Sequence, residues 1–115
     1  MKRINFYVCA DCGNILTQTG NGEMVCCGKK LNTLQPQKSD EMHKIQIEKI
    51  ENDFYITWKH PMKKEHYIHF IAYVRFDRIL LIKLYPEQNG EIRFPEMHGG
   101  KIYYYCNKDG LFEYI

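Results

Sequence analysis

The 115-residue sequence has no long hydrophobic run, no large charge of either sign and no convincing helical period. Its best candidate for a membrane span, residues 79–82, is far too short to cross a bilayer, so we expect no membrane partner. The net charge of +2 is too small to indicate a protein that binds nucleic acid. Only a brief apolar patch follows Lys2 and Arg3, which argues against a secretory signal and favours a cytoplasmic protein.

Aromatic residues, by contrast, are abundant. The chain has nine tyrosines and six phenylalanines, and this composition favours strands over helices. With 44% hydrophobic and 26% charged residues, the sequence is typical of a globular protein rather than a disordered one. Its length fits one ordinary domain, or a small module joined to a larger one.

The five cysteines form an odd set, and four of them lie within the first 27 residues. In a chain without an export signal, such clustering indicates metal ligation in a reducing cytoplasm rather than disulfides. These four fall in two pairs, Cys9 with Cys12 and Cys26 with Cys27. Adjacent cysteines can share an ion only if the backbone bends sharply, and Gly28 is placed to allow that bend.

A tetrahedral four-sulfur site binds either zinc or a single iron. Two other interpretations of the four cysteines remain open, namely a disulfide pair or idle thiols, and a zinc ribbon, although a ribbon usually offers C-x-x-C twice. A module this small has almost no core, so we expect the ion to hold it folded.

The polar segment 34–40, which contains Pro36, predicts a boundary between residues 1–36 and residues 37–115. The second part has the pattern of seven short strands separated by turns. They are expected at residues 44–50, 53–58, 66–76, 79–85, 91–94, 101–106 and 111–114. The fold class is therefore all-β, with a small metal-stabilised module followed by an immunoglobulin-like antiparallel β-sandwich.

His60 and His66 lie six residues apart, and the intervening residues can turn the chain back so that both rings face one point. His43 lies upstream and Cys106 near the end of the chain. Imidazoles with one thiolate favour iron, copper or zinc. Cys106 could equally be a buried free cysteine without a function. His69 is expected to be an exposed or rim residue of the sheet.

These motifs resemble those of the desulfoferrodoxins, the two-module form of superoxide reductase, over nearly the whole chain. The cysteine pairs resemble the family's desulforedoxin-like module, and residues 41–43, 60–62, 66–68 and 105–107 resemble its catalytic motifs in the same order. The resemblance implies two mononuclear iron sites. It assigns Cys9, Cys12, Cys26 and Cys27 to the first site, which could also hold zinc. It assigns three imidazoles, from His43, His60 and His66, and the axial thiolate of Cys106 to the second.

The activity that the resemblance implies is the reduction of superoxide to hydrogen peroxide. It also implies a small electron donor such as rubredoxin, a homodimer, and a catalytic role for Glu41 as the loop glutamate that can close over the resting site. In place of the family's lysine this chain has Met42. Lys44, Lys59, Lys63 and Lys64 are candidate replacements for its positive charge, and Lys44 is assigned to the catalytic site.

A second departure is Asp109, which stands where the family has its fourth histidine. Asp109 could bind the iron as a carboxylate or simply shape the turn before Gly110. Both departures favour an alternative function, a metal-binding or electron-transfer protein of this fold whose second site has lost catalysis. A zinc-stabilised interaction module is a further alternative, because sulfur ligands alone do not separate zinc from iron.

Overall fold

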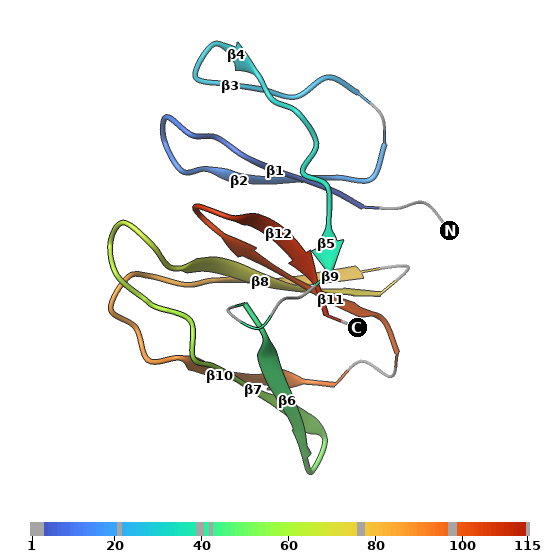
Figure 1. The fold of residues 1–115 in the computed structure, drawn as a ribbon. Helices are drawn as coiled ribbons and strands as arrows, with labels where there is room; N and C mark the ends of the chain where they lie inside the picture. The colour runs from blue at the N-terminus through green and yellow to red at the C-terminus, as the bar shows by residue number, and fades with distance from the viewer. Residues whose placement is uncertain are drawn as a thin grey trace. The chain divides into compact units, whose positions relative to one another are not determined.

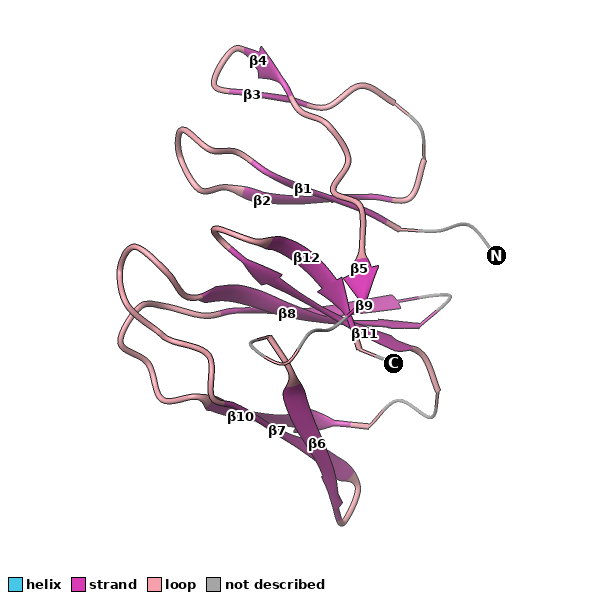
Figure 2. Ribbon diagram, in the orientation of Figure 1, coloured by secondary structure: helices cyan, strands magenta, loops and turns pink. Residues whose placement is uncertain are grey.

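The computed structural model describes residues 4–20, 22–38, 41, 43–75, 78–96 and 99–114. The chain divides into two compact units, Met1–Gln35 and Pro36–Ile115 (Figure 1). All regular structure in the described residues is β-strand, as Figure 2 shows, which confirms the predicted all-β class. Among these residues, none belongs to a helix with the length and apolar character of a membrane span.

The first unit is built from two short antiparallel pairs. Strand β1 (Asn5–Val8) pairs with β2 (Ile15–Gln18), and β3 (Val25–Cys26) pairs with β4 (Lys29–Lys30). The loop between β1 and β2 carries two of the cysteines, and the tight turn between β3 and β4 carries the other two. With so few paired residues, this unit has little regular structure of its own.

The second unit contains two sheets, which Figure 1 shows as separate layers. The three-stranded sheet, in the order β10-β7-β6, is antiparallel and consists of β6 (Ile45–Ile50), β7 (Asp53–Trp58) and β10 (Glu91–Pro95). The five-stranded sheet, in the order β5-β12-β11-β8-β9, consists of β5 (Gln37–Lys38), β8 (Ile68–Arg75), β9 (Arg78–Lys83), β11 (Lys101–Cys106) and β12 (Gly110–Glu113).

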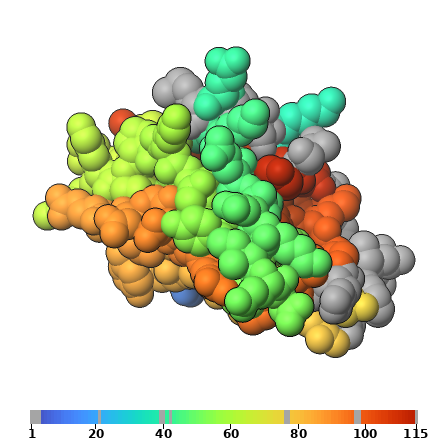
Figure 3. Space-filling model, turned by 90° about the horizontal axis from the view of Figure 1, so that it is seen from below, coloured from blue at the N-terminus to red at the C-terminus, as the bar shows by residue number. Residues whose placement is uncertain are grey.

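Apolar side chains from both sheets form one core. The three-stranded sheet contributes buried residues such as Ile45, Ile56 and Phe94, while the five-stranded sheet contributes Ile71 and Tyr104 among others. Such packing of two inner faces defines a β-sandwich, as predicted. Figure 3 shows one face of the molecule, on which the green residues of β6 and β7 lie beside the orange residues of β10.

Two of the differences from the sequence prediction bear on the larger sheet and the site. The segment expected to be an irregular linker contributes β5, which pairs in parallel with β12, so the larger sheet is not wholly antiparallel. Strand β8 begins at Ile68 rather than at residue 66, because His66 instead forms an isolated bridge with Lys63. That bridge closes a compact loop ahead of β8, and the loop fixes the position of His66.

Candidate metal centres

The first cysteine pair lies in a tight loop that follows β1. The Gly13 N–H donates to the Cys9 carbonyl (2.7 Å), and the Cys9 N–H donates to the Asn14 carbonyl (2.9 Å). Gly13 has a φ of +73°, a left-handed conformation that glycine adopts without steric cost. These constraints turn the chain back within five residues and bring the sulfurs of Cys9 and Cys12 to one side.

The second pair lies in the turn between β3 and β4. Cys27 and Gly28 both have positive φ values, +55° and +74°. Two successive left-handed residues reverse the chain, so the neighbouring side chains of Cys26 and Cys27 need not point to opposite faces. The sharp bend that the adjacent cysteines required is therefore confirmed, with Gly28 at its second position.

The four sulfur atoms gather as they would around an ion. Cys12 Sγ lies 3.5 Å from Cys26 Sγ, Cys26 Sγ lies 4.0 Å from Cys27 Sγ, and the whole set lies within 4.8 Å of one another. A metal–sulfur bond of about 2.3 Å separates the sulfurs of a tetrahedral site by about 3.8 Å. All four cysteines are free, and these separations are far longer than a disulfide bond of about 2.05 Å.

The thiols of this cluster differ in how readily they lose a proton. The backbone N–H of Cys12 lowers the pKa of Cys9 to about 7, so this sulfur is readily a thiolate. The nearby sulfurs of Cys12 and Cys9 raise the pKa of Cys27 to about 12. Four thiolates therefore cannot share this space in the absence of a cation. The donor set fits a tetrahedral zinc or iron ion, which would compensate their charge.

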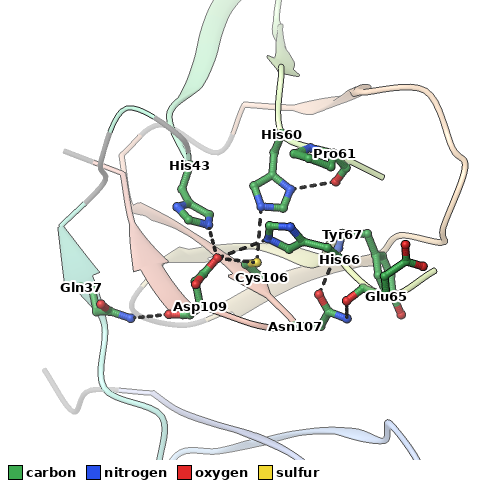
Figure 4. A network of polar contacts seen from close by, with 10 residues as sticks. All are labelled: Gln37, His43, His60, Pro61, Glu65, His66, Tyr67, Cys106, Asn107 and Asp109. Carbon is green, nitrogen blue, oxygen red and sulfur yellow. Dashed lines mark hydrogen bonds and ion pairs between the residues drawn. The ribbon is translucent and has the colours of Figure 1, made fainter. Parts of the chain in front are cut away.

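The second cluster draws its side chains from four separate segments of the second unit. His43 precedes β6, His60 follows β7, His66 ends the loop before β8, and Cys106 is the last residue of β11. Asp109 joins them from the turn between β11 and β12. One ligand atom from each of these five residues lies within 4.8 Å of every other (Figure 4).

The distances place Asp109 inside this cluster rather than beside it. Its Oδ2 lies 2.9 Å from His43 Nε2, 3.3 Å from His66 Nε2 and 3.5 Å from Cys106 Sγ. Hydrogen bonds from His43 and Cys106 lower the pKa of Asp109 despite partial desolvation, so it is a carboxylate.

His60 is held in the protonation state that a metal ligand needs. Its Nδ1 donates to the Pro61 carbonyl (2.8 Å), which leaves the lone pair on Nε2, and Nε2 lies 3.4 Å from Cys106 Sγ. Burial lowers the pKa of His60, so the ring is neutral at neutral pH. A carbonyl that fixes the tautomer in this way is the usual partner of a metal-bound histidine.

Cys106 is fully buried, and burial raises the pKa of its thiol. In the absence of a cation it therefore stays protonated, whereas a metal ion would displace the proton and bind the thiolate. Three imidazoles with one thiolate suit iron, copper or zinc, so the donor set fits the iron that the family resemblance implies.

Two further residues support the cluster, and sequence reasoning gave neither of them a role. Asn107 connects the loop that carries His66 to the end of β11, because its side chain accepts from the Tyr67 N–H (3.0 Å) and donates to the Glu65 carbonyl (3.2 Å). Phe112 stacks on His43, with ring centroids 4.4 Å apart and planes at 16°. A polar residue directly after Cys106 and an aromatic residue three positions after Asp109 were the available signals.

The proposed catalytic residues Glu41 and Lys44 are exposed and are not part of the five-residue cluster. Both line a pocket of about 320 Å³, together with the described residues Gln46, Thr57, Trp58 and Lys59. Met42, which lies between Glu41 and His43 in sequence, is outside the described residues. The pocket thus places two lysines and one glutamate on the segments that lead to His43 and His60.

The expectation that His69 is exposed was wrong. This side chain is only 5% exposed and lies among the rings of Tyr67, Phe70 and Tyr105. Every residue from Ile68 to Tyr73 in β8 is buried, whichever face of the sheet its side chain is on. His69 is therefore not at the exposed rim of the sheet. His69 is not a member of the metal-binding cluster.

No family model matches the chain. A desulfoferrodoxin from Syntrophotalea carbinolica is 34% identical over 119 residues, covering 96% of this chain and 94% of the relative. A desulfoferrodoxin from Desulfarculus baarsii is 32% identical over 119 residues, covering 95% and 94%. The crystal structure of the superoxide reductase from Treponema pallidum has the same fold, with a TM-score of 0.84 and 18% identity over 98% of each chain. On the strength of these full-length relatives, the chain belongs to the desulfoferrodoxin family.

Proposed function

We propose that this protein is a non-haem iron superoxide reductase, which reduces superoxide to hydrogen peroxide. Each superoxide ion takes up one electron and two protons, and no oxygen is released. The observation that carries the proposal is the convergence of His43, His60, His66 and Cys106 on one point, in a chain of the desulfoferrodoxin family. These residues come from four separate segments, and core packing alone would not require that their ligand atoms meet.

In this proposal both sites hold iron, and the chemistry that the second iron supplies when bound is a one-electron change tuned by a thiolate. His60 keeps Nε2 available because its Nδ1 is held by the Pro61 carbonyl. Phe112 fixes the plane of the His43 ring by stacking. Burial of Cys106 excludes water from the sulfur and protects it from oxidation.

The substrate is an anion, and the pocket on the segments next to His43 and His60 in sequence carries lysines that would attract it. Lys44 and Lys59 both line this pocket and are exposed to solvent. Their summed field, together with that of Lys63 and Lys64, raises the local concentration of superoxide. Glu41, which lines the same pocket, corresponds to the loop glutamate that the family resemblance implies.

Electrons reach the second site from a small donor such as rubredoxin, and Cys9, Cys12, Cys26 and Cys27 hold the electron-transfer iron. We further propose that the protein is a homodimer of the cytoplasm.

One alternative function has specific support. The carboxylate of Asp109 within the second cluster favours a metal-binding or electron-transfer protein that has lost catalysis.

Anaerobic purification, metal analysis and fast mixing with superoxide test the proposal. We expect two irons per chain, the red colour of a ferric four-sulfur centre, a thiolate-to-iron band, and superoxide consumption far faster than with free iron. Cys106→Ser should abolish the thiolate-to-iron band and turnover while the red centre remains. Cys27→Ser should abolish the red centre while the thiolate-to-iron band remains. Iron in both sites without turnover would support the electron-transfer alternative, and a colourless zinc protein would support an interaction module.

A further inference from the structure

We propose that Asp109 is itself a metal ligand, so that the second site has three imidazoles, one thiolate and one carboxylate. Two anionic donors would then stabilise the ferric state and lower the reduction potential of this site. The inference rests on the proposed function only for the identity of the metal as iron. Whether Asp109 binds an ion is independent of whether the site reduces superoxide.

The geometry distinguishes Asp109 from an ordinary turn residue. A carboxylate that only shapes a turn accepts hydrogen bonds from nearby backbone N–H groups or points into water. Asp109 Oδ2 instead lies close to the atoms through which three other cluster residues would bind, namely His43 Nε2 (2.9 Å), His66 Nε2 (3.3 Å) and Cys106 Sγ (3.5 Å). Figure 4 shows the carboxylate turned toward the two rings and the sulfur.

These separations suit ligands that share one ion. Metal–nitrogen and metal–oxygen bonds of about 2.1 Å at right angles to each other place the two donor atoms about 3.0 Å apart. The separation of 2.9 Å between Asp109 Oδ2 and His43 Nε2 matches this value. In the absence of an ion the same contact is a hydrogen bond, with the imidazole N–H donating to the carboxylate. Binding an ion would replace that proton without moving either side chain far.

The backbone holds Asp109 in this position. The Gln37 Nε2 donates to the Asp109 carbonyl (2.8 Å), which ties the turn to β5. Gly110 follows with a φ of +100°, and a Cβ added there would lie 2.8 Å from Gln37 Nε2. The left-handed residue directs the chain into β12 while the Asp109 side chain stays over Cys106. The carboxylate is 46% exposed, so solvent can still reach its outer side.

The consequence is electrostatic. A thiolate and a carboxylate together neutralise a divalent ion, whereas the single thiolate of a four-histidine site would leave one positive charge. The added negative charge favours the trivalent ion over the divalent one. We expect the ratio of ferric to ferrous affinity to fall at least tenfold when the carboxylate charge of Asp109 is removed. For one electron, a tenfold change corresponds to about 59 mV.

The test is the midpoint potential of the second centre in anaerobically iron-loaded full-length protein. Asp109→Asn and Asp109→His should raise the potential by at least about 59 mV and shift the thiolate-to-iron band, while Asp109→Glu should keep the potential low. Asp53→Asn is the matched control, because Asp53 is paired with Arg93 outside the cluster. The four-cysteine centre of the same molecule is the internal reference for folding and loading.

A potential and band in Asp109→Asn that equal those of the Asp53→Asn control would overturn the inference. If iron fails to load, titration with Co²⁺ replaces it. We then expect at least tenfold weaker binding at the second site of Asp109→Asn, and equal affinities would again overturn the inference. Superoxide consumption is measured separately. Wild-type protein that consumes superoxide no faster than free iron, together with a raised potential in Asp109→Asn, would contradict the proposed function and leave the ligand assignment standing.

Discussion

Asn107 and Tyr67 are joined by two hydrogen bonds of opposite direction across a separation of 40 residues. The Tyr67 N–H donates to Asn107 Oδ1 (3.0 Å), and the Asn107 N–H donates to the Tyr67 carbonyl (3.2 Å). The side-chain Nδ2 of Asn107 also donates to the Glu65 carbonyl (3.2 Å). The loop that ends in His66 is therefore fastened to the strand that ends in Cys106, and these two candidate ligands keep a fixed separation.

We expect Asn107→Ala to loosen this loop. Losing two hydrogen bonds of the side chain should cost about 1–3 kcal/mol of unfolding free energy. Co²⁺ binding at the second site should weaken, while binding at the four-cysteine site stays unchanged. Asn89→Ala is the control, since Asn89 is exposed and is not part of the cluster. Unchanged Co²⁺ affinity at both sites would show that the side-chain hydrogen bonds of Asn107 do not position His66.

Phe112→Ala should affect both the core and the second metal site. Phe112 is 2% exposed and stacks on His43 and on Tyr104. Truncating a buried phenylalanine costs roughly 3–5 kcal/mol, and His43 would lose the ring that fixes its plane. Urea unfolding of metal-free protein and Co²⁺ titration measure the two effects. Phe94→Ala, in the three-stranded sheet, should be similarly destabilising but should leave metal affinity intact in the folded protein.

Gly28→Ala should weaken the four-cysteine site through the backbone alone. A Cβ at Gly28 would meet nothing within 4 Å, but its φ of +74° is strained for alanine, at a cost of order 1–3 kcal/mol. Because about 1.4 kcal/mol of binding free energy corresponds to a tenfold change in the dissociation constant, we expect Zn²⁺ affinity to fall by roughly tenfold or more. Gly20→Ala is the control, since it also has open space and its φ lies outside the left-handed region. Equal zinc affinities in the two variants would contradict this account of the turn.

His69 should make stability depend on pH. Burial, aided by the charge of Lys83, lowers the pKa of His69 below its ordinary value of 6.5. Below pH 6.5 the unfolded chain therefore binds more protons at this residue than the folded one does. The stability contributed by the neutral ring is fully present above pH 6.5 and is lost as the pH falls through the folded pKa.

The comparison of wild type with His69→Phe isolates this effect, because the other histidines are the same in both proteins. Unfolding free energies from urea titrations at pH 8 and pH 5.5 should differ more for the wild type than for the variant. Parallel pH profiles for the two proteins would show that His69 does not titrate over this range.

Much of the architecture could be predicted from local pattern. Strict alternation over residues 44–50 and the turn signals between strands led to the sandwich, since period and turn chemistry are local properties. The four-cysteine cluster could also be predicted from the sequence, because two short motifs and one glycine determine its turns. His43, His60, His66 and Cys106 were selected with the help of a family resemblance, and the structure brings all four together.

Other features depend on tertiary context that no local pattern contains. The burial of His69 follows from the coverage of β8 on both faces, whereas its sequence neighbours only suggest a strand. Whether Asp109 turns inward depends on the φ of Gly110 and on a hydrogen bond from Gln37, which is distant in sequence. Gln37 itself lies in a segment so polar that a strand was not expected there, and pairing with β12 supplies the stabilisation that its own residues lack.

The parallel pairing of β5 with β12 also bears on how the second unit behaves when it is prepared separately. Unpaired outer strands offer free N–H and C=O groups to other molecules and promote aggregation. Strand β9 is the other outer strand of the sheet and carries Arg78 and Lys83, whose charges oppose such association. A shortened protein that begins at Pro36 retains Gln37 and Lys38 to cover the edge of β12, whereas one that begins after Lys38 would leave that edge open to association with further copies.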